Sequence, residues 1–255
     1  MGFDFQFLIF DMFSNKWLVT TILVLVAGAV MIRLGIWQLD RLAARRVFNA
    51  NALAQQTAAT LDLNAADPGL DLEQMEYRQV RATGVFVFSE EVALRNQVFE
   101  GWPAYRLITP LQLTGLGTLV LVDRGYVPAD RYTPGDREPY ARPAGEVTIS
   151  GILRGSETEP DIGSRGDPTP APGEELLAWN LVNVIRIGEQ VEGSLLPVYV
   201  QQASGGVPGE FPVPATFIPE LTEGPHLGYA IQWFTFAGIL WIGYPFYFLK
   251  NRSED

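Results

Sequence analysis

The chain has 255 residues, 47% apolar and 18% charged, a composition typical of one or two folded domains. It contains no cysteine and a single histidine, which excludes disulfides, thiolate metal sites and metal clusters built from several histidines. Its net charge of −11 repels a phosphate backbone, so no nucleic-acid partner is expected.

The N-terminal part predicts a membrane span over residues 17–39. Trp17 to Ile32 contain no charged side chain, and the apolar stretch continues through Leu39 if Arg33 is allowed, which meets the roughly 20 residues that a span needs. The preceding segment, residues 1–16, is rich in phenylalanine and carries acidic residues where a signal peptide would be basic. We expect it to lie along the membrane surface.

A helical stalk and a strand-rich domain are expected next. Residues 40–60 are rich in alanine and suit a helix that continues out of the membrane. Residues 61–225 then contain short apolar runs of strand character, separated by Pro- and Gly-rich loops, and one short helix near Val184 to Glu192. The expected strands are Tyr77 to Phe88, Val92 to Phe99, Tyr105 to Leu113, Thr118 to Val127, Val147 to Leu153, Leu176 to Val182 and Leu195 to Gln201.

A second span is predicted over residues 226–249, followed by a short tail, residues 250–255. Leu227 to Leu249 carry no charge, are closed by Lys250, and hold aromatic residues at both ends. The fold class predicted is therefore an α+β membrane protein in which two transmembrane helices flank a β-rich, antiparallel extramembrane domain.

The charges place that domain in water. The charged residues before residue 40 sum to zero, as do those after His226, so the middle segment holds the whole −11. By the positive-inside rule, the arginines that follow span one would keep this domain in the cytoplasm. That rule loses force for loops as long as this one. The residues alone leave the side open.

His226 is the main candidate site residue. It opens span two, and helical spacing places it near Tyr229 and Trp233, so its imidazole could hold a haem iron while the macrocycle lies on the apolar surface. With a single histidine, the other axial position would be open, filled by Met31 or solvent, or supplied by another chain. The alternative is an interfacial histidine bonded to a backbone carbonyl, with the aromatic residues as a membrane anchor.

Other residues of the spans have two interpretations each. Arg33 and Arg41 could pair with cofactor propionates or could simply snorkel to the interface. Small residues would let helices approach closely, either within the chain or with a partner's helix. The predicted helix-interface residues are Gly28, Gly35, Trp37, Gln38, Ala230 and Ala237.

We find no enzyme in this sequence. The serines lack a glycine elbow and a partner histidine, and the Gly115-Leu116-Gly117 string leads into a strand rather than a helix. No catalytic residue is therefore assigned.

Three strings together resemble the SURF1 family, assembly factors of haem-copper cytochrome oxidase. They are Leu34-Gly35-Ile36-Trp37-Gln38-Leu39-Asp40-Arg41-Leu42, Val122-Asp123-Arg124-Gly125-Tyr126-Val127-Pro128 and His226-Leu227-Gly228-Tyr229-Ala230-Ile231-Gln232-Trp233-Phe234. Weaker similarity between them extends the resemblance to about residues 16–250. The sequence departs from the family pattern at Tyr126, where tryptophan is common, and in the proline-rich insertion Glu157 to Glu175.

The resemblance implies a role in building the catalytic subunit of an aa3-type oxidase, at the insertion of haem a. It implies a two-span protein of the bacterial inner (plasma) membrane, with its domain on the periplasmic side, or of the mitochondrial inner membrane in a eukaryote. His226 matches the histidine associated with haem a, and expected partners are the catalytic subunit, haem A synthase and membrane lipid. Two alternatives remain: a resident accessory subunit that never handles haem, and a solute-binding membrane sensor.

Overall fold

The structure is a computed structural model that describes residues 12–160, 166–171, 173–203, 210–214 and 217–252. Most of the predicted surface segment, residues 1–16, lies outside the described residues, as do parts of the proline-rich insertion Glu157 to Glu175, of the segment before the predicted second span, and of the tail, residues 250–255. The chain forms two compact units. One consists of Met1–Asn51 and Leu221–Asp255, and the other of Ala52–Glu220.

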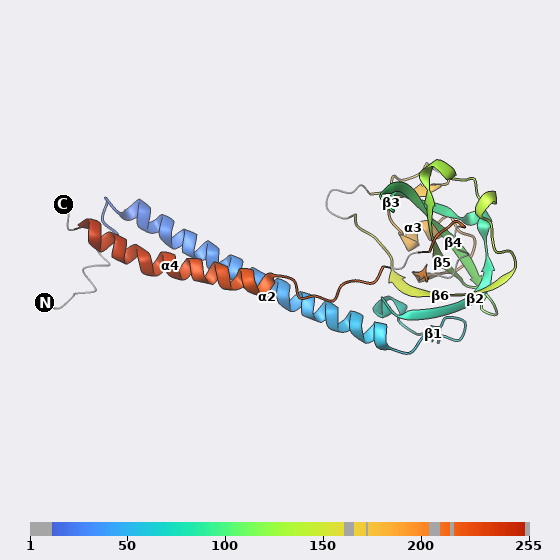
Figure 1. Cartoon of the computed structure of the whole chain (residues 1–255), viewed down its shortest axis with the longest axis horizontal. Helices are drawn as coiled ribbons and strands as arrows, with labels where there is room; N and C mark the ends of the chain where they lie inside the picture. Colours follow the sequence, from blue (N-terminus) through green and yellow to red (C-terminus); the bar gives the residue numbers. More distant parts are fainter. Residues whose placement is uncertain (1–11, 161–165, 172, 204–209, 215–216, 253–255) are drawn as a thin grey trace. The chain divides into compact units, whose positions relative to one another are not determined.

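Two long helices make up the first unit. Helix α2 covers Leu18–Thr57, its last turns falling in the second unit, and helix α4 covers His226–Arg252. They run antiparallel and side by side (Figure 1). Helix α2 is unbroken across the predicted span and stalk, because its alanines and leucines favour helix throughout and it contains no proline.

By length and composition, one helix of the described residues could cross a membrane, and that helix is α2. Helix α4 is long enough to cross a bilayer and has no charged residue between its first residue and Lys250. Its tyrosines, tryptophans and Gln232 lower its hydropathy relative to an aliphatic helix. The second span therefore stays a prediction.

The two helices pack along a seam with a seven-residue period. Buried residues recur with this period at Thr21, Gly28, Gly35 and Leu42 on α2 and at Ala230, Ala237 and Tyr244 on α4, and Phe248 on α4 is buried as well, against the Trp17 ring. A repeat of 3.5 residues per turn keeps one stripe of each helix facing the other, as in a coiled coil. At one end of the seam Thr21 Oγ1 and the Tyr244 hydroxyl are hydrogen-bonded at 2.6 Å.

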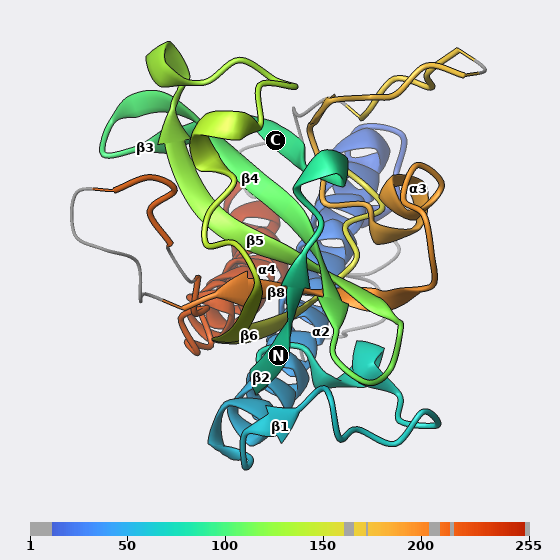
Figure 2. The same cartoon turned by 90° about the vertical axis from the view of Figure 1, so that its right-hand side faces the viewer.

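The second unit is a barrel-like β domain (Figure 2). Its sheet has the order β1-β2-β6-β8-β5-β4-β3-β7, and β2 also pairs with β4, which closes the ring β2-β6-β8-β5-β4. The strands are β1 Leu61–Asp62, β2 Gln79–Phe86, β3 Val92–Phe99, β4 Trp102–Leu113, β5 Leu119–Pro128, β6 Glu146–Gly155, β7 Ala178–Trp179 and β8 Leu195–Gln202. The short helix α3 covers Val184–Gly188.

The prediction of a β-rich domain is confirmed, and five of the eight strand pairings are antiparallel as predicted, but three are parallel. Strands β5 and β8 pair in parallel, as do β1 with β2 and β3 with β7. A parallel neighbour requires a long connection, and the 66 residues from Ala129 to Ser194 that lie between β5 and β8 provide it.

Strand β5 lies at the centre of the domain. Val120 and Val122 pack into one apolar cluster, and Leu119 and Leu121 into another, because successive side chains of a strand point to opposite faces. The strand is therefore buried on both faces. The charged residues that follow, Asp123 and Arg124, enter the interior as well.

Candidate functional site

His226 and Gln38 meet where α4 begins. The imidazole Nδ1 lies 2.8 Å from Gln38 Oε1. An amide oxygen can only accept a hydrogen bond, so Nδ1 carries the proton and the lone pair of the neutral ring is on Nε2. A ring oriented in this way has the nitrogen that could ligate a metal turned away from Gln38.

Tyr229 and Trp233 continue the same flank of α4, at one and two helical turns beyond His226. Tyr229 is 48% exposed, and the Trp233 ring makes an edge contact with Phe236 at 6.2 Å between centroids. On α2, Arg41 follows Gln38 by three residues, so it shares the flank that adjoins His226. The structure thus joins His226 to Gln38, and helical spacing puts Tyr229, Trp233 and Arg41 on the adjoining flanks of the two helices.

The other predicted site residues fall elsewhere. Gly28, Gly35, Ala230 and Ala237 lie buried in the seam between the helices. Gly35 faces α4, and Arg33 and Trp37 each lie two residues from it along the helix. This spacing directs both side chains away from α4. Both side chains are exposed. The structure therefore does not bring Arg33 together with His226.

A group of hydrogen bonds fixes the chain just before His226. Arg46 makes a two-pronged ion pair with Glu223, with Nε–Oε1 and Nη2–Oε2 distances of 2.7 and 2.9 Å. Arg45 Nε and Asn49 Nδ2 each donate to the carbonyl of Thr222 at 3.0 Å. We call these contacts the clasp. The hydrogen bond from Arg46 lowers the pKa of Glu223 and raises that of Arg46.

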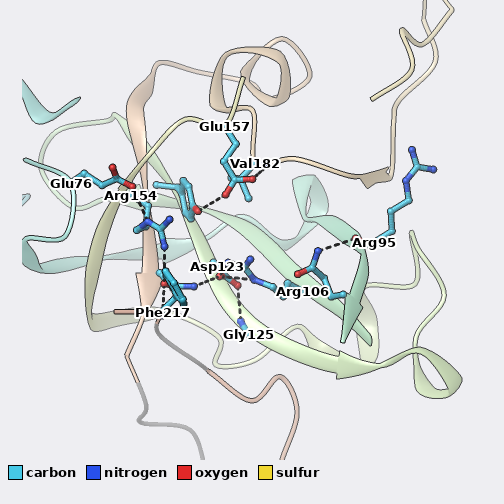
Figure 3. Close-up of polar contacts among 12 residues, drawn as sticks. Glu76, Arg95, Arg106, Asp123, Gly125, Arg154, Glu157, Val182 and Phe217 are labelled. Atoms are coloured by element: carbon cyan, nitrogen blue, oxygen red, sulfur yellow. Dashed lines mark hydrogen bonds and ion pairs between the residues drawn. The ribbon is translucent and has the colours of Figure 1, made fainter. Parts of the chain in front are cut away.

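A buried ion pair lies inside the β domain (Figure 3). Arg106 on β4 donates to Asp123 Oδ2 on β5, with an Nε–Oδ2 distance of 2.9 Å, while Asp123 Oδ1 accepts from the Gly125 N–H at 3.1 Å. Burial alone would lower the pKa of Arg106, but the charge and hydrogen bonds of Asp123 outweigh it and raise that pKa.

The next residue, Arg124, points to the opposite face and pairs with Glu91, at 2.7 Å from Nη1 to Oε2. Its other amino group donates to the carbonyls of Tyr140 and Arg142, also at 2.7 Å. Burial raises the pKa of Glu91 and lowers that of Arg124, and the two charges oppose both shifts. Arg124 therefore ties the loop after β5 to the barrel.

Gly125 completes the string. Its φ of +114° suits glycine, and a Cβ there would overlap the carbonyl of Val213. Val213 pairs with Tyr126 through two backbone hydrogen bonds of 2.9 Å. The Asp123-Arg124-Gly125 string thus supplies one partner to each of two buried ion pairs, and its glycine leaves room for the backbone of Val213.

Among the described residues, no group of three or more His, Cys, Asp or Glu side chains is placed to hold a metal ion. Within the helical unit, the described site consists of the His226 imidazole, held by Gln38, and the Tyr229 and Trp233 rings on the same flank of α4.

A family model described as the SURF1 family matches residues 25–238. The chain belongs to the SURF1 family. An uncharacterised SURF1-like protein of Mycobacterium tuberculosis is 34% identical over 177 residues, which cover 68% of this chain and 60% of the relative. The SURF1-like protein of Monosiga brevicollis is 28% identical over 239 residues, covering 87% of this chain and 84% of the relative.

A human relative is named Surfeit locus protein 1 and is 30% identical over 154 residues, or 53% of this chain and 49% of the relative. The chain thus spans about half to three fifths of the mycobacterial and human relatives that it matches. All three strings that pointed to the SURF1 family lie entirely within the matched region.

Sequence reasoning missed the roles of Asp123 and Arg124 and the clasp. The sequence does contain a signal for the roles of Asp123 and Arg124. These two charged residues directly follow the apolar run Leu119 to Val122, and charges in a buried strand require partners. Nothing in the sequence indicated which of the chain's arginines would pair with Glu223.

Proposed function

We propose that this SURF1-family chain is a membrane-anchored assembly factor for an aa3-type haem-copper cytochrome c oxidase. It would hold haem a, as cargo, during insertion into the catalytic subunit, or stabilise the state of that subunit that receives haem. The observation that supports this proposal best is the hydrogen bond between His226 and Gln38, because it fixes the only imidazole of the chain at the start of α4 with Nε2 left as a ligand.

The residues around His226 fit such a cargo. Tyr229 and Trp233 provide ring surface for a porphyrin, and Arg41 provides a positive charge suited to a propionate. Arg33 lies on another face of α2, so we assign it to the membrane interface instead. A single histidine ligand gives weak ligation, which suits a protein that must release what it carries.

The proposed setting is the bacterial inner membrane, or the mitochondrial inner membrane in a eukaryote, with the β domain on the outer side. Helix α2 and, in this proposal, α4 both cross the bilayer. The partners would be the oxidase catalytic subunit, haem A synthase and lipid, and the chain would have no catalytic turnover of its own.

The direct test is the absorption spectrum of the full chain purified from cells that make haem a. We expect bound haem a in the wild-type protein and its loss in His226→Ala. Ile242→Ala serves as the matched control, because Ile242 lies on the same helix, is 66% exposed and is about four turns from His226. A normal haem content in the His226 variant would remove the ligand role.

A second measurement separates assembly from a permanent structural role. An assembly factor should be found with oxidase intermediates and be missing from most mature enzyme. A resident accessory subunit would instead copurify with active oxidase in a one-to-one ratio, and that result would replace the proposal.

A further inference from the structure

A cavity of about 470 Å³ opens beside the turn that joins β3 to β4. This volume is within the range of sites that bind small molecules and peptide side chains. The lining residues are Phe99, Glu100, Trp102, Pro103, Ala104, Pro128, Ala129, Asp130, Arg131 and Phe211. We call this cavity the hairpin pocket.

Aromatic rings and prolines form most of its walls. Trp102 is 73% exposed, which is unusual for the largest apolar side chain, and neighbouring Val98 is 67% exposed. The Phe99 ring is held in place by stacking on Tyr126, with 5.0 Å between ring centroids. The pocket is therefore a preformed aromatic surface with one ring fixed and another projecting into solvent.

The backbone of the pocket offers few hydrogen bonds to an occupant. Pro103 and Pro128 have no N–H, and Ala104 already pairs with Pro128 across β4 and β5. A new β-strand would require a row of free backbone groups. A polyproline II segment requires none, because its backbone stays solvated while its rings stack on aromatic side chains.

The same end of β5 already accommodates a proline-containing extended segment of the chain itself. Val213, between Pro212 and Pro214, bonds to Tyr126 in both directions at 2.9 Å. Phe211 of that segment forms part of the hairpin pocket. An external proline-rich segment would lie next to the internal one.

The charges around the pocket favour a basic occupant. Glu100 and Asp130 are exposed at its edge, and the guanidinium of Arg131 lies over the Phe211 ring, 5.4 Å from its centroid. Two carboxylates thus face solvent beside the aromatic surface, on a chain whose net charge is −11. Charge complementarity of this kind steers a positively charged partner to the site.

We propose that the hairpin pocket binds an extended, proline-containing segment of another protein, with an arginine or lysine beside the proline. The proline ring would stack between Trp102 and Phe211, and the basic side chain would reach Glu100 or Asp130. This interaction is independent of haem and of the helix pair.

The experiment uses the full chain in detergent and a fluorescein-labelled synthetic peptide with two Pro-Pro steps flanked by arginines, followed by fluorescence anisotropy. Two further peptides replace the prolines by glycine or the arginines by glutamate. We expect the first peptide to bind, and each replacement to weaken binding about tenfold or more.

The protein variants locate the site. Trp102→Ala should weaken binding about tenfold or more, Trp102→Phe should restore part of it, and Glu100→Lys with Asp130→Lys should abolish the preference for arginine. Ile185→Ala is the matched control, since Ile185 is 67% exposed on α3 and lies outside the pocket. Thermal unfolding of each variant checks that it folds.

Several results would overturn the proposal. These are no binding of the arginine peptide to wild-type protein, equal binding of the glycine peptide, unchanged binding to Trp102→Ala, or equal loss in Ile185→Ala. None of them bears on the haem proposal, which depends on His226.

Discussion

The indole ring of Trp241 occupies the space that a side chain at position 28 would take. A Cβ on Gly28 would overlap that ring, and a Cβ on Gly35 would lie 2.6 Å from the ring of Phe234. The two glycines of α2 are therefore required by two aromatic residues of α4. This packing sets the register of the helices, and the register in turn sets which residue of α2 meets His226.

Replacing Gly28 by leucine should separate the two helices, because overpacking of this kind costs about 1–3 kcal/mol. The chain has no cysteine, so cysteines can be introduced at Thr21 and Tyr244, which are hydrogen-bonded in the native protein, and joined by a short bis-maleimide. We expect a lower crosslinking yield in Gly28→Leu. Gly238→Leu is the control, since a Cβ there meets nothing within 4 Å; equal yields in both variants would contradict the packing argument.

Changing Gln38 should affect haem binding through His226. Gln38→Leu removes the acceptor for Nδ1–H, and loss of such an outer partner typically weakens metal affinity about 10–100-fold. Gln38→Glu keeps an acceptor and should retain ligation, with an iron midpoint potential shifted downward by the added negative charge. Both are measured by haem titration and redox potentiometry of the full chain. An unchanged affinity in Gln38→Leu would exclude the positioning role.

Removing Asp123 should destabilise the β domain by about 3–5 kcal/mol, since Arg106 would remain buried without its partner. The double change Arg106→Met with Asp123→Leu should recover much of this loss. Thermal unfolding of the domain provides the measurement. Arg95→Ala serves as the comparison, because Arg95 is more exposed and its nitrogen is 3.8 Å from Asp167, and it should cost about 1 kcal/mol or less.

Gly125→Ala should lower the unfolding temperature by more than about 5 °C, through backbone strain of about 1–3 kcal/mol and overlap with the Val213 carbonyl. Gly115→Ala isolates the first of these effects. Gly115 also has a positive φ, +84°, but a Cβ there meets nothing within 4 Å. The two variants should differ clearly, and equal shifts would mean that the approach of Val213 does not matter.

Acidification should open the clasp. The folded-state pKa of Glu223 is lowered by Arg46, so the stabilisation is complete above the unfolded pKa, about 4.3, and is lost as the pH falls through the lower folded value. The protection factors of the amides of residues 222–224 and 226 should therefore fall below about pH 4. In Glu223→Gln they should already be lower at pH 7, whereas Glu138→Gln should leave them unchanged.

Local pattern predicted most of the strands. The predicted run Tyr77 to Phe88 contains β2, Gln79–Phe86, which alternates in burial, and Thr118 to Val127 matches β5 within one residue at each end. These runs succeed because alternation and turn residues are encoded locally. Of the predicted strand Leu176 to Val182, only Ala178 and Trp179 pair as a strand. The run is apolar because Trp179 and Val182 pack their side chains into the core. Apolar content reports burial rather than backbone pairing.

Closure of the barrel could not be predicted, because it depends on contacts distant in sequence. Gly84 allows β2 to approach the Gln112 carbonyl of β4, a pairing that no local pattern indicates. The candidate site shows the same limit. Spacing within α4 grouped His226 with Tyr229 and Trp233, but the partner Gln38 lies 188 residues away and is selected by the packing of Gly28 and Gly35.

The seven-residue period of the helix seam makes the chain unequally tolerant of insertions and deletions. Each residue added or removed between Gly35 and Gln38 would rotate Gln38 by about 100° around the helix axis and carry it out of reach of the imidazole. Seven residues added at once would restore the angular phase but shift the amide about 10 Å along the axis. Length variation during evolution should therefore be concentrated in the loops of the β domain, and the distance from the glycines to Gln38 should stay constant.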